Sequence, residues 1–115
     1  RLPRVLVNSS QLPAEPARGA VWSITGAERD LDSNLIRLPP GERIGLHVGA
    51  EVDVLIHVVS GAGALLLPEG EHPLRAGDVA LLPRRSRRGF RTGADGLEYL
   101  TVHRRRQSLQ IGTRR

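Results

Sequence analysis

The chain offers a small set of side chains for acid–base or metal chemistry. Histidine occurs at positions 47, 57, 72 and 103, and the acidic residues Glu51 and Asp53 lie between the first two. No cysteine is present, which excludes a disulfide scaffold and any thiolate metal site. Arginine is the third kind of functional group and is concentrated between residues 84 and 91. Imidazole, carboxylate and guanidinium groups are therefore the chemistry available.

Glycines and prolines set these residues at ordered intervals in two segments. The first segment runs from Pro39-Pro40-Gly41 through His47-Val48-Gly49 and a β-type run to Ser60-Gly61. The second contains Gly77-Asp78, then Pro83, then the arginine-rich stretch that ends at Arg91. This series resembles the two signature motifs of the cupin family, in which glycines and a proline mark the strand ends. The resemblance extends from Gly41 to Arg91.

The resemblance also implies where a metal would be bound. Family members place two histidines and a glutamate in the first motif and a third histidine in the second. The corresponding positions in this chain are His47, Gly49, Val54 and Arg88. Gly49 has no side chain, Val54 cannot coordinate, and Arg88 carries a permanent positive charge that repels a cation. We therefore expect no metal and no other cofactor at this site.

A rebuilt metal site is the alternative, drawn from Glu51, Asp53, His57 and His103. A one-residue slip of the strand register would turn Asp53 inward. That slip would also turn the apolar residues of the same strand out of the core, so the sequence favours a sheet or dimer-interface position for His57. His103 either faces the barrel mouth or caps a sheet edge, and His72 falls in an expected surface turn.

Short β-type runs alternate with glycine, proline, asparagine and aspartate breaks. Their spacing predicts an all-β fold, and the family resemblance implies a double-stranded β-helix, which is a jelly-roll barrel. The predicted strands cover residues 4–7, 20–24, 35–38, 44–47, 52–59, 64–67, 79–82, 89–92 and 97–103. Residues 68–73 and 93–96 are predicted hairpin connections. In the run 52–59, alternation places Val54, Ile56 and Val58 inside the barrel.

We expect one cupin-like domain over residues 1–115, built on a core of leucine, valine and isoleucine because the chain has one Trp, one Tyr and one Phe. Residues 1–19 are predicted to form an N-terminal strand and arm, of which 11–18 are an extended arm or loop. Residues 107–115 are predicted to form a tail that frays.

The net charge of +5 comes entirely from arginine, since the sequence has no lysine. A nucleic-acid surface would interleave such charges with aromatic residues for stacking, and aromatics are scarce here. A basic module that binds nucleic acid or an acidic partner is therefore the third-ranked functional class. No apolar run is long enough to span a bilayer and no signal-peptide pattern opens the chain, so we expect a cytoplasmic protein without a membrane partner.

Without metal ligands, His47 and Arg88 are expected to project into the same barrel mouth. Arg88 would then clamp an anion bidentately, unless it extends into solvent or pairs with Glu51, Asp53 or Glu98. The other candidate ligand-binding residues are Trp22, Phe90, Tyr99 and His103. The sequence thus favours a metal-independent protein that binds a small polar or anionic organic molecule.

An enzyme is the main alternative, because a fold of this kind does not fix the chemistry. Cupin relatives include isomerases, epimerases, decarboxylases and dioxygenases, and His47 is the candidate catalytic residue, acting either without a metal or in a rebuilt metal site. The resemblance also implies a homodimer, for which outward-facing Leu55, His57 and Val59 would suit the interface. The N-terminal segment could add a strand to the sheet edge of the partner.

Overall fold

The computed structural model describes residues 2–106, which form strands joined by turns and loops and contain no helix. The strands are β1 (Gly19–Ser23), β2 (Leu31–Leu38), β3 (Arg43–Val48), β4 (Val54–Leu67), β5 (Gly70–Arg75), β6 (Val79–Leu82) and β7 (Arg87–Arg104). All pair antiparallel. The predicted all-β jelly-roll fold is confirmed. In this part of the chain no helix is long and apolar enough to cross a membrane.

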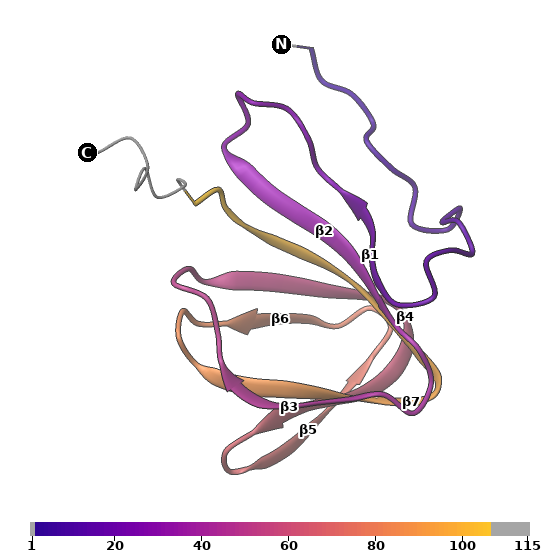
Figure 1. Cartoon of the computed structure of the whole chain (residues 1–115), viewed down its shortest axis with the longest axis vertical. Coiled ribbons are helices and arrows are strands. Elements are labelled where there is room, and N and C mark those ends of the chain that lie inside the picture. Colours follow the sequence, from indigo (N-terminus) through magenta and orange to yellow (C-terminus); the bar gives the residue numbers. More distant parts are fainter. Residues whose placement is uncertain (1, 107–115) are drawn as a thin grey trace.

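Two long strands, β4 and β7, organise the barrel by taking part in both of its layers (Figure 1). The first layer comprises β1, β2 and β6 with residues 54–58 of β4 and 97–104 of β7. The second layer comprises β3 and β5 with residues 63–67 of β4 and 87–92 of β7. Between the layers, the register of β4 and β7 shifts twice, and both strands bend there. The free ends of the two layers therefore point to the same side.

The bend corrects the prediction of a hairpin connection at residues 93–96. These residues lie within β7, and the predicted strands 89–92 and 97–103 are parts of this one strand. Gly96 has a positive φ of 73°, and Gly61 on β4 faces it with a φ of 81°. Glycines that suggest a chain reversal in the sequence are used here to bend two paired strands. The predicted strands 52–59 and 64–67 likewise belong to the single strand β4.

Two other strand predictions also differ from the structure. The hairpin expected over residues 68–73 is present, but its turn is only Pro68-Glu69, and the residues that follow form β5. The strand expected at residues 4–7 is absent, because this segment pairs with no strand of the described chain, and the first strand begins at Gly19. Residues 11–18 form the predicted loop. The predicted tail, 107–115, lies outside the described residues.

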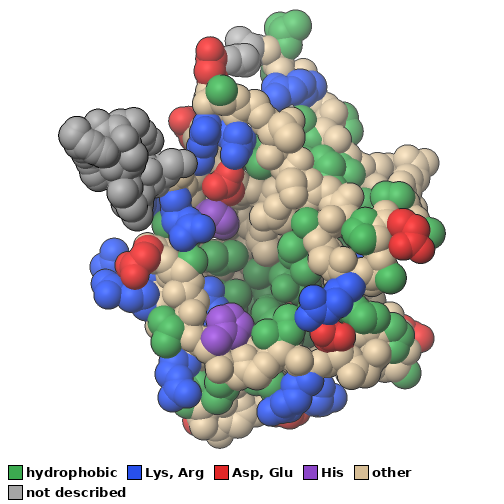
Figure 2. All heavy atoms as spheres, in the orientation of Figure 1, with side chains coloured by type: hydrophobic (Ala, Val, Ile, Leu, Met, Phe, Trp, Pro, Cys, Tyr) green, Lys and Arg blue, Asp and Glu red, His purple; other side chains and the backbone are tan. Residues whose placement is uncertain are grey.

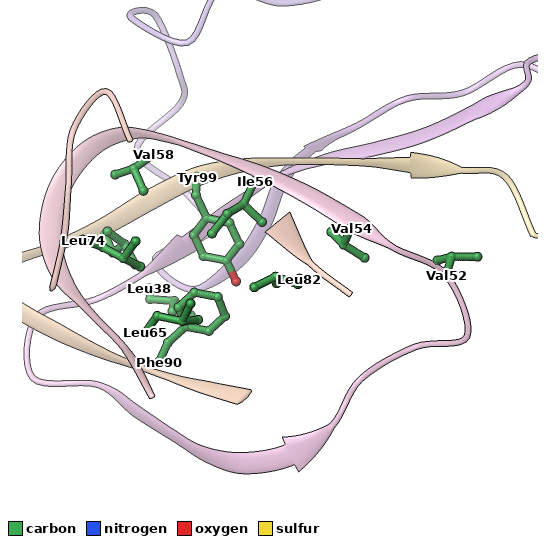
Figure 3. Packing of buried hydrophobic residues seen from close by; sticks show 11 residues of the cluster. Leu38, Val52, Val54, Ile56, Val58, Leu65, Leu74, Leu82, Phe90 and Tyr99 are labelled. Atoms are coloured by element: carbon green, nitrogen blue, oxygen red, sulfur yellow. The ribbon is translucent and has the colours of Figure 1, made fainter. Parts of the chain in front are cut away.

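The core fills the space between the two layers. Val54, Ile56 and Val58 are buried as their alternation predicts, and Leu55 and His57 between them are exposed. Phe90 of the second layer and Tyr99 of the first layer stack with ring centroids 5.0 Å apart (Figure 3). Burial of each large apolar side chain contributes roughly 1.5–3 kcal/mol, so this cluster holds the layers together.

We predict that adding one methyl group at the bend strongly destabilises the fold. A Cβ at Gly61 would overlap the carbonyl oxygen of Gly96, and the φ of Gly61 lies in the left-handed region. We expect Gly61→Ala to lower the free energy of unfolding by about 2 kcal/mol or more, as measured by urea denaturation. Gly45→Ala is the matched control, because nothing lies within 4 Å of its added Cβ. Equal stability of the two variants would contradict the role assigned to the bend.

Candidate functional site

The free ends of the two layers form one mouth of the barrel. Arg88 is the first residue of β7 whose side chain lies on the inner face of the second layer. It is directly paired with His47 of β3. Ile44 of β3 pairs with Phe90 two residues further along β7, so β3 holds one extra residue between Ile44 and His47. This bulge returns His47 to the inner face that Ile44 occupies. His47 and Arg88 are therefore neighbours on the same face of the β3–β7 pair.

Arg88 is buried, with 6% of its surface exposed. Its Nη1 donates hydrogen bonds to the carbonyl oxygens of Pro83 and Ser86, each at 3.1 Å, and to Ser86 Oγ at 2.8 Å. No carboxylate of residues 2–106 forms an ion pair with it. Burial lowers the pKa of the Arg88 guanidinium, which nevertheless remains charged at neutral pH.

The carboxylates that were candidate partners of Arg88 are engaged elsewhere. Glu51 pairs with Arg85 at 3.3 Å, and Glu98 pairs with Arg37 at 2.6 Å. Asp53 Oδ1 accepts a hydrogen bond from the backbone nitrogen of Arg84 at 2.8 Å. The pairing alternative for Arg88 is therefore wrong, and so is its extension into solvent.

The Arg88 guanidinium retains free donors. Nε and Nη2 make no hydrogen bond to any described residue, whereas every fully buried side-chain nitrogen or oxygen in that part of the chain has a partner. Nε and Nη2 must therefore remain in contact with solvent-accessible space. A charged group with two unused donor nitrogens at a barrel mouth can accept a carboxylate or phosphate in a bidentate manner.

The residues at the family's ligand positions do not fit a metal ion. A Cβ built on Gly49 would overlap the guanidinium of Arg88, so this group fills the space of a side chain at position 49. Val54 is part of the apolar core. Of the four positions, His47 alone carries a ligating group. The metal that the family resemblance implies therefore has no complete ligand set at these positions.

The alternative ligand set is not assembled either. Asp53 is exposed just before β4, and His57 lies on the outer face of β4, since the register places Val54 inward. Within residues 2–106, no group of three or more histidine, aspartate and glutamate side chains lies close enough to hold a metal ion. The register slip that would have turned Asp53 inward does not occur.

Tyr99 supplies a polar group at the apolar floor of the mouth. It is 7% exposed, it packs against Phe90, and Figure 3 shows its hydroxyl on the side of the ring nearest Leu82. The hydroxyl has no hydrogen-bond partner among the described residues, yet no fully buried polar atom there lacks one. The hydroxyl must therefore reach solvent-accessible space. Burial raises the pKa of Tyr99 to about 12, so the phenol stays protonated and can donate.

His47 is exposed, and its Nδ1 lies 2.9 Å from the carbonyl oxygen of Gly45. A carbonyl can only accept, so Nδ1 carries the proton of this hydrogen bond and Nε2 of the neutral ring keeps a free lone pair. This lone pair is available as a proton acceptor next to the Arg88 cation.

His103 and Trp22 have different places relative to the mouth. His103 follows Tyr99 and Thr101 on the inner face of β7, at the free end of the first layer, and its Nδ1 lies 2.8 Å from the carbonyl oxygen of Arg104. Trp22 pairs with Leu35, which lies on the face opposite to Tyr99, so Trp22 does not line the mouth. Figure 2 shows histidine side chains on either side of a hollow lined by hydrophobic residues.

Two cavities have other linings. One, of about 510 Å³, is lined by residues of the N-terminal arm and of the β1–β2 connection. The other, of about 400 Å³, lies beside the mouth and is lined by Glu51, Val52, Asp53, Arg84 and Arg104. Sequence reasoning did not assign Arg84 or Arg104 to a site. In the sequence, the one indication was that each arginine comes shortly after a predicted strand, 79–82 for Arg84 and 97–103 for Arg104.

The outer face of the first layer is apolar. Leu55 pairs with Leu81, and His57 pairs with Val79, and all four side chains are exposed or partly exposed. The expected homodimer through Leu55, His57 and Val59, and the strand exchange by the N-terminal segment, stay predictions.

The raised pKa of Tyr99 predicts a specific alkaline transition. The folded state holds this proton more tightly than the unfolded state, whose tyrosine titrates near 10. Stability is therefore unaffected below pH 10 and falls between about pH 10 and pH 12, by up to roughly 2–3 kcal/mol. Because Tyr99 is the only tyrosine, absorbance at 295 nm reports its ionisation directly, and a native midpoint near 10 would contradict its burial.

Comparisons with known proteins agree with the fold. A family model described as "Cupin domain" matches residues 34–103. Among curated proteins, Protein SchB of Streptomyces halstedii is 36% identical over 64 residues, which are 56% of this chain and 46% of that protein. The chain thus spans about half the length of the curated relative that it matches.

Solved structures show the same fold. A sugar phosphate isomerase from a cupin superfamily of Silicibacter pomeroyi is 30% identical, with a TM-score of 0.61 over 70% of this chain and 54% of that one. The polyketide cyclase RemF of Streptomyces resistomycificus is 21% identical, with a TM-score of 0.67 over 89% of this chain and 80% of that one. KdgF of a Halomonas species is 20% identical, with a TM-score of 0.64 over 88% and 94% of the two chains.

Proposed function

Because the chain belongs to the cupin domain family, we propose that it binds a small organic anion in the barrel mouth without a metal ion. The observation that carries the proposal is the buried guanidinium of Arg88, which has no carboxylate partner in the described chain and keeps Nε and Nη2 free. A buried charge without a counter-charge is costly. A bound anion would supply that counter-charge.

The floor of the mouth defines the rest of the ligand. Phe90 and Tyr99 stack on each other within the apolar cluster below the mouth, and the Tyr99 hydroxyl adds one hydrogen-bond donor. A pocket of apolar walls with a few polar groups suits a small molecule that has an apolar body and one anionic group. The ligand class is therefore an aromatic or aliphatic carboxylate, or a related oxyanion.

The aromatic residues also argue against the nucleic-acid alternative. Base stacking needs accessible aromatic faces, but Phe90 and Tyr99 are buried in the core. Several arginines are already paired with carboxylates, among them Arg37 with Glu98 and Arg91 with Glu71. Arg88 is a buried cation without a carboxylate partner among the described residues, which favours a small anion.

Removal of the guanidinium tests the proposal. We expect Arg88→Ala to weaken the binding of 2-naphthoate by roughly 1.5–3 kcal/mol, the range for a hydrogen bond to a charged group, as measured by isothermal titration calorimetry. Arg87→Ala is the matched control, because Arg87 is the exposed neighbour on the same strand. Unchanged affinity in Arg88→Ala would overturn the proposal, as would stoichiometric zinc, iron, manganese or nickel in protein purified without added metal.

Acid–base catalysis is the second candidate function, and the free Nε2 of His47 beside Arg88 favours it. Arg88 would hold the anionic group of a substrate while His47 accepts a proton. Because relatives of this fold include a sugar phosphate isomerase and a polyketide cyclase, small keto acids and sugar phosphates are the substrates to test. Conversion that is lost in His47→Ala would support catalysis, and the absence of any conversion would contradict it.

A further inference from the structure

We infer that Gly49 is a positioning residue for Arg88, and that its missing side chain is what gives the mouth an anion-binding guanidinium in place of a metal ligand. The inference deepens the proposed function and rests on it for the ligand class. Its geometric part, the coupling of positions 49 and 88, stands on the structure alone.

Positions 49 and 88 are coupled because they compete for the same volume. A Cβ at Gly49 would overlap three atoms of Arg88, the guanidinium carbon and both of its terminal nitrogens. Gly49 therefore leaves open the volume that the guanidinium now occupies. Its backbone φ lies outside the left-handed region, in contrast to that of Gly61. Glycine is needed at position 49 because of the neighbouring side chain and not because of the backbone conformation.

The backbone at Gly49 is held in place, so it cannot move away from Arg88. The amide of Gly49 donates to the carbonyl oxygen of Ser86 at 3.0 Å, and the amide of Arg85 donates to the carbonyl oxygen of Ala50 at 2.8 Å. These two hydrogen bonds join the loop after β3 to the loop before β7. The same Ser86 carbonyl also accepts from Arg88 Nη1. Gly49, Ser86 and Arg88 therefore form one hydrogen-bonded unit.

A side chain at position 49 would displace the guanidinium and leave the fold intact. The overlapping atoms belong to the far end of a flexible side chain, and such an end can rotate at lower cost than backbone can shift. Displacement would break the bonds from Nη1 to Pro83 and Ser86 and would remove the charge from the mouth. The family's histidine at this position and Arg88 therefore exclude each other, which explains why both positions differ from the family pattern.

The first test needs no ligand. A crystal structure of Gly49→Ala should show the Arg88 guanidinium moved away from Pro83 and Ser86, with the strands unchanged. In Gly45→Ala, whose added Cβ meets nothing within 4 Å, the three hydrogen bonds of Nη1 should remain. Circular dichroism and the melting temperature of each variant would establish that it is folded. A guanidinium that keeps its place in folded Gly49→Ala would overturn the inference.

The second test uses 2-naphthoate. Gly49→Ala should weaken its binding roughly 10-fold or more, as expected for loss of a hydrogen bond to a charged group, and Gly49→Ala combined with Arg88→Ala should bind no more weakly than Arg88→Ala alone. Additive losses would show that the two positions act independently and would contradict the inference. If the unaltered protein bound no 2-naphthoate while the Arg88 guanidinium was displaced in the Gly49→Ala structure, the proposed function would fail and the positioning role of Gly49 would stand.

Discussion

The burial of Arg88 without a carboxylate is the interaction on which the chemistry of this barrel depends. Removing a guanidinium from water costs free energy, and three acceptors on Pro83 and Ser86 recover part of that cost through Nη1. The remaining donors, on Nε and Nη2, are left to solvent or to a ligand. Gly49 makes this arrangement possible by leaving the required space. The mouth is thus a fixed, positively charged site whose geometry is set by protein atoms.

The bend of β4 and β7 places the Arg88 guanidinium beside an apolar hollow. Because β4 and β7 each run through both layers, the inner residues of one strand can face each other across the core. Phe90 and Tyr99 both belong to β7 and stack in this way. Arg88 lies two residues before Phe90 on the same face. The bend that stabilises the barrel therefore also sets the position of the guanidinium above the aromatic floor.

Much of this arrangement could be predicted from the sequence, because the signals were local. The alternation of Val54, Ile56 and Val58 was sufficient to orient β4. The spacing of the strand breaks indicated an all-β fold, and the family resemblance implied the jelly roll. The expectation that His47 and Arg88 share one mouth came from the resemblance, and the register of β3 and β7 pairs the two residues. The residues 93–96 were misread because a glycine at positive φ has the same appearance in a turn and in a bent strand.

What the sequence could not supply were relations between distant residues. The overlap of Gly49 with the Arg88 guanidinium depends on two loops that are joined by backbone hydrogen bonds, and no local pattern encodes that contact. The place of Trp22 on the outer side followed from a register with a bulge in β1. In the sequence, Trp22 was a candidate pocket residue only because it is aromatic. The absence of an ion pair at Arg88 likewise could not be predicted, because it depends on the other partners that Glu51, Asp53 and Glu98 have in the fold.

A crystal structure of the protein with 2-naphthoate would test the central claim most directly. The carboxylate should lie within hydrogen-bonding distance of Arg88 Nε and Nη2, with the rings toward the apolar side chains of the mouth. A metal ion held by His47, or naphthoate bound elsewhere with the guanidinium left free, would contradict it.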